Sequence, residues 1–86
     1  MTGAEKMISL LSLLEYGQTG VITDISKYSR ELNALGIRVG KIVKMITKQP
    51  IKGPVVVMAG EVVVAIGIER ASCITVNTGL IPPGNS

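Results

Sequence analysis

The chain has 86 residues, of which 47% are hydrophobic and only two are aromatic, and its net charge is +3. A chain of this length makes one small domain, and its core must be built from aliphatic side chains. Histidine, the commonest general base and transition-metal ligand, is absent, and the single cysteine, Cys73, excludes an internal disulfide. We therefore expect a protein of a reducing, cytoplasmic compartment that is not an enzyme and holds no cofactor.

The N-terminal segment has the pattern of a short amphipathic helix. Thr2 and Glu5 fit a capping box, in which a threonine at the helix start is followed three residues later by a glutamate. The apolar residues that recur behind it at helical spacing are Met7, Leu10, Leu11 and Leu14. We expect a helix over about residues 4–14 that lies on the surface of the domain and ends before Gly17.

A β-branched run over residues 17–25 predicts the first strand, and a second short helix is expected directly after it. This helix should extend over about residues 27–35, with Asp24 or Ser26 as its N-cap. Its apolar stripe consists of Tyr28, Leu32 and Leu35. Because so short a helix is unstable alone, we expect the stripe to dock on the sheet.

The chain changes from helical to strand periodicity between Gly36 and Gly40. Gly36 stands where a helix C-cap needs a left-handed residue, which glycine adopts at little cost. After Gly40 the apolar side chains recur at every second position. This alternation predicts a strand over residues 41–47, with Val43 and Met45 facing inward.

The remaining sequence is dominated by short β-branched runs. They predict strands over residues 55–58, 62–66 and 73–76, the first two joined by a tight hairpin at Ala59–Gly60. Glycines at the ends of elements are expected to form structural turns. They are Gly36, Gly40, Gly53 and Gly60. Residues 77–86, rich in proline and glycine, are expected to form a loose tail.

These elements predict a mainly β fold, a single domain over residues 1–76. We expect a small antiparallel β-barrel of about five strands with one or two short helices. Its six acidic residues are scattered and make no paired acid–base site. The sulfur atoms of Met45, Met58 and Cys73 could bind a soft metal ion, but they are better explained as parts of the core. We therefore expect neither a catalytic site nor a metal site.

Both faces of several predicted strands are apolar, although a barrel this small cannot cover both. If Val43 and Met45 point inward, Ile42 and Ile46 point outward among basic residues. The candidate partner-binding residues are Ile42, Ile46, Lys41, Lys44, Lys48 and Arg38. Such a face fits a protein partner or a second copy of the chain. Alternatively, the N-terminal helix covers it.

Basic residues are concentrated in the middle of the chain. Seven of the nine lie between Lys27 and Lys52, where Glu31 alone opposes them. They could form one basic side, suited to an acidic protein, a phosphate-rich partner or an anionic membrane, or simply a solvated surface. The longest apolar stretch, residues 54–68, is interrupted by Glu61 and is shorter than a membrane-spanning helix, so we expect no span.

The order and spacing of the motifs resemble those of the FeoA family. The matching segments, which together cover about residues 10–76, are Gly17–Ile22, Leu32–Gly40, Pro50–Pro54 and Glu69–Val76. In the family these are a strand with the pattern GQxGxI, a helix that ends in LxxLG, a PxxxP loop and a closing strand. Two positions depart from the pattern. The family often has proline where this chain has Val39, and Arg70 adds one residue to the spacing of the last motif.

The resemblance implies an SH3-like β-barrel that assists FeoB, the membrane ferrous-iron transporter with a cytoplasmic GTPase domain. The same fold also occurs as the C-terminal domain of iron-dependent repressors of the diphtheria-toxin-repressor type, so a metal-sensing domain is one alternative. A nucleic-acid-binding SH3-like barrel is another. The basic stretch supports it, but two tyrosines offer little stacking for bases, so we expect nucleic acid to be an improbable partner.

Overall fold

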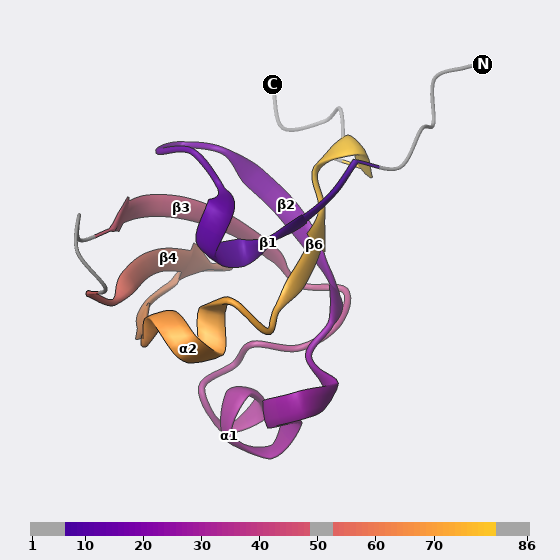
Figure 1. The fold of residues 1–86 in the computed structure, drawn as a ribbon, viewed down its shortest axis with the longest axis vertical. Coiled ribbons are helices and arrows are strands. Elements are labelled where there is room, and N and C mark those ends of the chain that lie inside the picture. Colours follow the sequence, from indigo (N-terminus) through magenta and orange to yellow (C-terminus); the bar gives the residue numbers. More distant parts are fainter. Residues whose placement is uncertain (1–6, 49–52, 81–86) are drawn as a thin grey trace.

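The computed structural model describes residues 7–48 and 53–80 of the chain. They form a single antiparallel sheet of six strands in the order β1-β6-β2-β3-β4-β5, which curves around an aliphatic core (Figure 1). The strands are β1 (Ile8–Leu10), β2 (Thr19–Asp24), β3 (Ile42–Lys48), β4 (Val55–Ala59), β5 (Val62–Ile66) and β6 (Thr75–Asn77). The short helices are α1 (Ser29–Ala34) and α2 (Ile68–Ala71), and the 3-10 turns are η1 (Leu11–Leu13), η2 (Ser26–Tyr28) and η3 (Thr78–Leu80). No helix in these ranges is long and apolar enough to cross a membrane.

The mainly β class predicted from the sequence is confirmed. All five predicted strands are present, and their ends differ from the prediction by at most two residues. The hairpin between β4 and β5 is also confirmed, with Gly60 at a φ of +66°. The strand that the sequence pattern did not reveal is β1.

The prediction of an N-terminal helix over residues 4–14 is wrong for the part of this segment that the structure describes. Ile8–Leu10 forms β1, which pairs with β6, and only the 3-10 turn η1 follows. Leu11 and Leu14 are fully buried, whereas Leu13 between them is 63% exposed. The spacing of apolar residues therefore reflects a strand followed by a tight turn, and pairing with β6 decides between that arrangement and a helix.

The prediction of a loose tail over residues 77–86 is wrong at the start of this range. Asn77 is the last residue of β6, and η3 follows it. The Asn77 side chain is 3% exposed, and its Oδ1 accepts hydrogen bonds from the backbone N–H groups of Met7 (3.3 Å) and Gly79 (2.8 Å). This buried amide ties the start of β1 to the turn after β6. The rest of the expected tail and the capping box at residues 2–5 lie outside the described residues.

Three rows of side chains cross the inner face of β3, β4 and β5. The rows are Val43, Ala59 and Val62; Met45, Val57 and Val64; and Lys48, Val55 and Ile66. The register of β3 shifts between Met45 and Thr47, which makes Ile46 an inserted bulge residue. Lys48 consequently shares the side of the sheet on which Val55 is buried.

The pairings within the described ranges leave β1 and β5 as the two edges of the sheet, so the barrel is not closed by strand pairing there. Side chains from the connecting segments complete the core instead. Leu11 and Leu14 come from η1 and the residue after it, and Leu32 and Ile37 come from α1 and the loop behind it. All four are fully buried.

α1 ends in a Schellman motif. The Gly36 N–H, at a φ of +88°, donates to the carbonyl of Asn33 (3.0 Å). The Ile37 N–H donates to the carbonyl of Leu32 (2.9 Å). Gly36 is therefore confirmed as a structural turn. Leu35, which was expected in the buried stripe, is 47% exposed because the helix ends before it.

The other predicted turns and caps are partly confirmed. Gly40 adopts a φ of +93° and is a turn residue. Gly53 is separated from β4 by Pro54 and adjoins segment 49–52, which is outside the described residues. Neither Asp24 nor Ser26 makes a side-chain cap to η2 or α1. Instead, the Ser26 hydroxyl donates to the Asp24 carboxylate at 3.3 Å.

Candidate docking surface

The outward face of β3, β4 and β5 carries apolar side chains that are open to solvent. The outward rows are Lys44, Met58 and Val63, and Thr47, Val56 and Ala65. Val63 is 56% exposed and Met58 is 37% exposed. We call the apolar members of this surface the outer apolar face. They are Ile42, Ile46, Val56, Met58, Val63 and Ala65.

The structure places Ile42 and Ile46 as the strand alternation predicts. They are 37% and 39% exposed, while Val43 and Met45 are fully buried. The bulge keeps Ile46 outward although the register of β3 shifts there. The orientation of these side chains is confirmed, and their role in binding stays a prediction.

Met58 and Val63 do not belong to the site predicted from the sequence, yet they lie opposite each other across the β4–β5 hairpin on the same surface. The signal that identifies them is the apolar character of both faces of β4 and β5. A soluble two-stranded hairpin with one solvated face ordinarily alternates apolar and polar residues. The surplus apolar side chains therefore mark this hairpin as part of the candidate surface.

Two of the four predicted basic residues lie next to the outer apolar face. Lys44 is within it, directly opposite Met58. Lys41 extends over the hairpin turn, where its Nζ is 3.3 Å from the position that a Cβ on Gly60 would occupy. A partner approaching this face would meet both ammonium groups.

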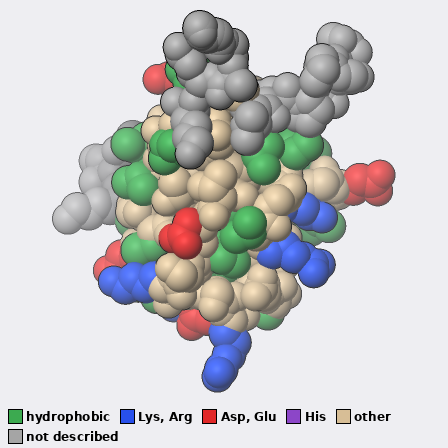
Figure 2. All heavy atoms as spheres, turned by 90° about the vertical axis from the view of Figure 1, so that its right-hand side faces the viewer, with side chains coloured by type: hydrophobic (Ala, Val, Ile, Leu, Met, Phe, Trp, Pro, Cys, Tyr) green, Lys and Arg blue, Asp and Glu red, His purple; other side chains and the backbone are tan. Residues whose placement is uncertain are grey.

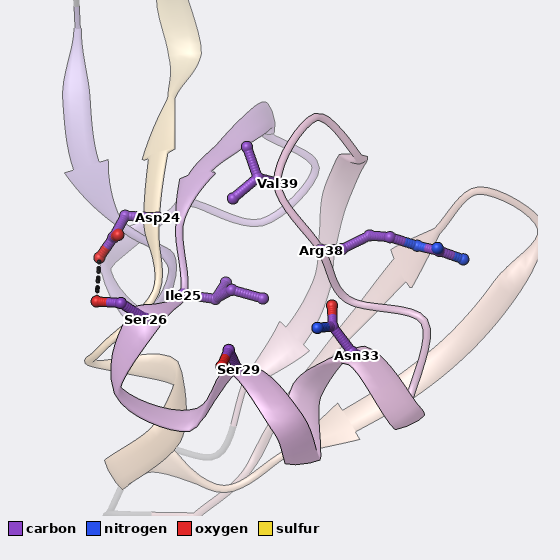
Figure 3. A pocket seen from close by; sticks show the side chains of 7 residues that line it. All are labelled: Asp24, Ile25, Ser26, Ser29, Asn33, Arg38 and Val39. Carbon is purple, nitrogen blue, oxygen red and sulfur yellow. Dashed lines mark hydrogen bonds between the residues drawn. The ribbon is translucent and has the colours of Figure 1, made fainter.

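The other two predicted basic residues point elsewhere. The ammonium group of Lys48 donates hydrogen bonds to the carbonyl oxygens of Leu14 (2.9 Å) and Ser12 (3.4 Å), so it is engaged within the fold. Arg38 lies in the loop after α1, and its guanidinium extends away from the hollow beside that loop (Figure 3). The structure therefore separates Lys48 and Arg38 from the outer apolar face.

The described part of the N-terminal segment does not cover the outer apolar face. Residues 8–13 form β1 and η1, and η1 lies on the inner side of the sheet, where the ammonium group of Lys48 donates to the Ser12 carbonyl. The exposed fractions of Val63 and Met58 agree with this placement. The alternative in which an N-terminal helix shields this face is thus not supported over residues 7–14.

A hollow of about 490 Å³ opens between η2, α1 and the loop before β3 (Figure 3). Its lining residues are Asp24, Ile25, Ser26, Ser29, Asn33, Arg38 and Val39. Asp24 contributes the one carboxylate of this lining, and the lining holds no histidine or cysteine. The hollow offers hydroxyl and amide groups for hydrogen bonding but no acid–base pair.

α1 and α2 are joined by an exposed ion pair. Arg70 Nε lies 2.6 Å from Glu31 Oε1, and the Arg70 guanidinium lies over the Tyr28 ring, 4.7 Å from its centroid. The hydrogen bond from Arg70 lowers the pKa of Glu31, and the same bond raises the pKa of Arg70. This cluster fixes α1 against α2 and occupies one of the two tyrosine rings of the chain.

Over residues 7–48 and 53–80, no three His, Cys, Asp or Glu side chains lie together as a group that could hold a metal ion. The three sulfur side chains are dispersed. Met45 is fully buried, Cys73 is half-buried, and Met58 lies on the outer apolar face. The interpretation of these residues as core is confirmed for Met45 and wrong for Met58.

The fold and its surface define a small, mainly β domain of the barrel class. The family model described as FeoA domain matches residues 10–78. The chain belongs to the FeoA family, which confirms the resemblance seen in the sequence and links the protein to ferrous iron transport. None of the curated proteins compared matches the chain.

Solved structures show the same fold. An iron uptake regulatory protein, FeoA, is 27% identical with a TM-score of 0.75, and the match covers 83% of this chain and 96% of that one. FeoA from Stenotrophomonas maltophilia, complexed with zinc, is 29% identical with a TM-score of 0.62, and the match covers 77% and 86% of the two chains. The latter is described as a procaryotic SH3 domain protein, for which activation of ferrous iron transport is suggested. The SH3-like fold is therefore confirmed for this chain.

A manganese-dependent transcriptional repressor shares the fold as well. Its TM-score is 0.78 at 20% identity, and the match covers 86% of this chain but only 43% of the repressor. At this identity the likeness concerns the fold alone. The chain spans less than half of the repressor's length.

Proposed function

We propose that this protein is a non-enzymatic, cytoplasmic accessory protein of ferrous iron uptake that docks on the cytoplasmic part of a FeoB-type GTPase transporter. The observation that carries the proposal is the outer apolar face on a chain of the FeoA family. Activation of ferrous iron transport, suggested for the Stenotrophomonas maltophilia relative, points in the same direction.

The outer apolar face has the properties of a small interface core. Its isoleucines, Met58 and Val63 are each more than one-third exposed in the free protein. Burial of one such side chain against a partner contributes about 1–2 kcal/mol at ~25 cal/mol per Å². Lys44 within this face and Lys41 beside it would steer an acidic partner and set its orientation rather than supply most of the affinity.

The test is binding of this protein to the isolated cytoplasmic domain of the transporter, measured by calorimetry. The double variant Ile42→Asp/Ile46→Asp should weaken binding at least about tenfold, because two charges would be buried in an apolar interface. The control is Leu13→Asp, which makes the same apolar-to-acid change at a 63% exposed residue of η1, outside the outer apolar face. A folded double variant that binds as tightly as the Leu13→Asp control would overturn the proposed surface.

A nucleic-acid partner has less support. The Tyr28 ring is covered by Arg70, and the Tyr16 hydroxyl donates to the carbonyl of Lys48 at 3.2 Å, so both aromatic side chains have partners within the fold. On the face shown in Figure 2, Lys and Arg side chains lie in separate groups among hydrophobic and acidic ones. We expect no shift of labelled RNA or DNA at low salt, where phosphate contacts are strongest.

A further inference from the structure

The free edge of β5 lacks the usual protection of edge strands. Within residues 7–48 and 53–80, β5 pairs with β4 on one side and with no strand on the other. Natural sheets protect such edges from pairing with another chain by charged residues, proline, bulges or very short strands. The opposite edge, β1, has only three residues, whereas β5 has five, all apolar, in unbroken register with β4.

The backbone groups on this edge can be identified from the hairpin. Ala59 and Val62 flank a two-residue turn and face each other, which makes them a hydrogen-bonded pair in such a hairpin. Because hydrogen-bonded pairs alternate along antiparallel strands, the N–H and C=O groups of Val63 and Ala65 point away from β4. Both residues are exposed.

A side chain at the same edge is also incompletely buried. Val62 belongs to an inner row with Val43 and Ala59, which are 0% and 3% exposed. Val62 itself is 59% exposed. The inner layer of the sheet is therefore open to solvent where β5 begins, so another strand beside β5 would bury both its polar backbone and this valine.

We propose that two copies of the chain associate by antiparallel pairing of their β5 strands about a two-fold axis at Val64. In this register Val63 of one copy lies opposite Ala65 of the second copy. These are the two residues whose N–H and C=O groups point outward, so both pairs are hydrogen-bonded. The edge therefore complements itself, as a two-fold interface requires.

The same register keeps inner and outer side chains on their own faces. Val62 of one copy lies opposite Ile66 of the second copy on the inner side, which covers the exposed valine. On the outer side, Met58 and Val63 of one copy continue into Ala65 of the second. The outer apolar face thus becomes continuous across the pair.

Charge and space at the ends of β5 permit this arrangement. Glu61 of one copy comes opposite Gly67 of the second, and nothing lies within 4 Å of the position that a Cβ on Gly67 would take. The two Glu61 residues are six strand positions apart, roughly 20 Å at the rise of a β-strand. That distance exceeds the screening length of about 8 Å at physiological ionic strength, so these carboxylates do not oppose the pairing.

The test uses the purified chain between about 10 μM and about 1 mM, a range that reveals weak dimers. Sedimentation velocity should show the mass rising toward twice that of the monomer, and NMR hydrogen exchange should show the Val63 and Ala65 amides becoming protected over the same range. Val63→Pro, which removes an outward N–H that β4 does not use, should abolish both the rise in mass and the protection of the Ala65 amide. Val63→Thr, which keeps the N–H and the β-branched shape, should preserve them.

Three results would overturn the proposal. One is a wild-type chain that stays monomeric at the highest concentration with both amides unprotected. The second is a dimer that Val63→Pro leaves intact or that protects amides of another strand. The third is protection of Val63 and Ala65 only after the transporter's cytoplasmic domain is added, which would make β5 a site for that partner. The pairing does not depend on the proposed transporter docking, since it is measured with this chain alone.

Discussion

The side-chain ammonium of Lys48 lies 2.9 Å from the carbonyl oxygen of Leu14 and 3.4 Å from that of Ser12. The register shift between Met45 and Thr47 turns this lysine toward the inner row, opposite Val55. A residue that the strand pattern suggests as part of the binding surface is instead a link between β3 and η1. This link holds in place the turn that buries Leu14.

Replacing Lys48 should therefore affect stability. We expect Lys48→Met to lower the free energy of unfolding by about 1–3 kcal/mol, because two carbonyl groups lose a charged donor. Urea denaturation, monitored by circular dichroism, measures this free energy of unfolding. Lys44→Met, at an outward position of the same strand, is the matched control and should change stability by no more than about 0.5 kcal/mol. Equal effects of the two variants would show that the Lys48 contacts contribute nothing.

At Gly20 the strand β6 approaches the backbone of β2 closely. A Cβ at this position would lie 3.1 Å from Val76 Cβ and 3.2 Å from Val76 Cγ2, tighter than ordinary contact. Gly20→Ala should therefore lower the unfolding free energy by about 1–3 kcal/mol. Gly67→Ala, where no atom lies within 4 Å, should be within about 0.5 kcal/mol of the wild type. Thermal unfolding measures the stability of both variants. A Gly20→Ala variant as stable as Gly67→Ala would contradict the tight packing of β6 against β2 at this position.

Asn77 should be needed to hold β1. Asn77→Ala leaves the N–H groups of Met7 and Gly79 without their side-chain acceptor, which should cost about 1–3 kcal/mol. In this variant we also expect the amides of β1 to exchange faster than in the wild type, with a larger change than in β3. Ser26→Ala removes an exposed hydrogen bond and serves as the control, with an expected change below about 0.5 kcal/mol. Unaltered exchange in β1 would argue against this role of the amide.

The ion pair between α1 and α2 predicts a pH effect. The hydrogen bond from Arg70 lowers the pKa of Glu31 in the folded protein. A lowered folded pKa stabilises the fold above the unfolded pKa, and this contribution is lost as the pH falls through the folded pKa. In Arg70→Gln, NMR titration should show the Glu31 carboxyl closer to its ordinary pKa, and the stability difference from wild type should narrow in acid. The same Glu31 pKa in both proteins would contradict the pairing.

The strands from β2 to β6 could be predicted because each has a local signal. The alternation of Val43 and Met45 with Ile42 and Ile46 gives the orientation of β3, and glycine marks the hairpin after β4. β1 could not be predicted in this way. Its apolar spacing suits a helix equally well, and only its pairing with β6, far along the chain, selects the strand.

The candidate site was predictable to a similar degree. Ile42 and Ile46 follow from a period of two along one strand. The inward direction of Lys48 does not follow from this period. The bulge that reverses it arises from the pairing of β3 with β4, which no local pattern reveals. Met58 lies on the same face through cross-strand register, and its exposure likewise depends on which elements cover the hairpin.

We propose that this protein acts through its outer apolar face. Methyl NMR of the labelled protein, titrated with the cytoplasmic domain of a FeoB-type transporter, tests it most directly. We predict that the methyl signals of Ile42, Ile46, Met58 and Val63 shift or broaden, while that of Val39 beside the hollow stays unchanged. Shifts confined to Val39 and its neighbours, or no shift at saturating transporter domain, would contradict the claim.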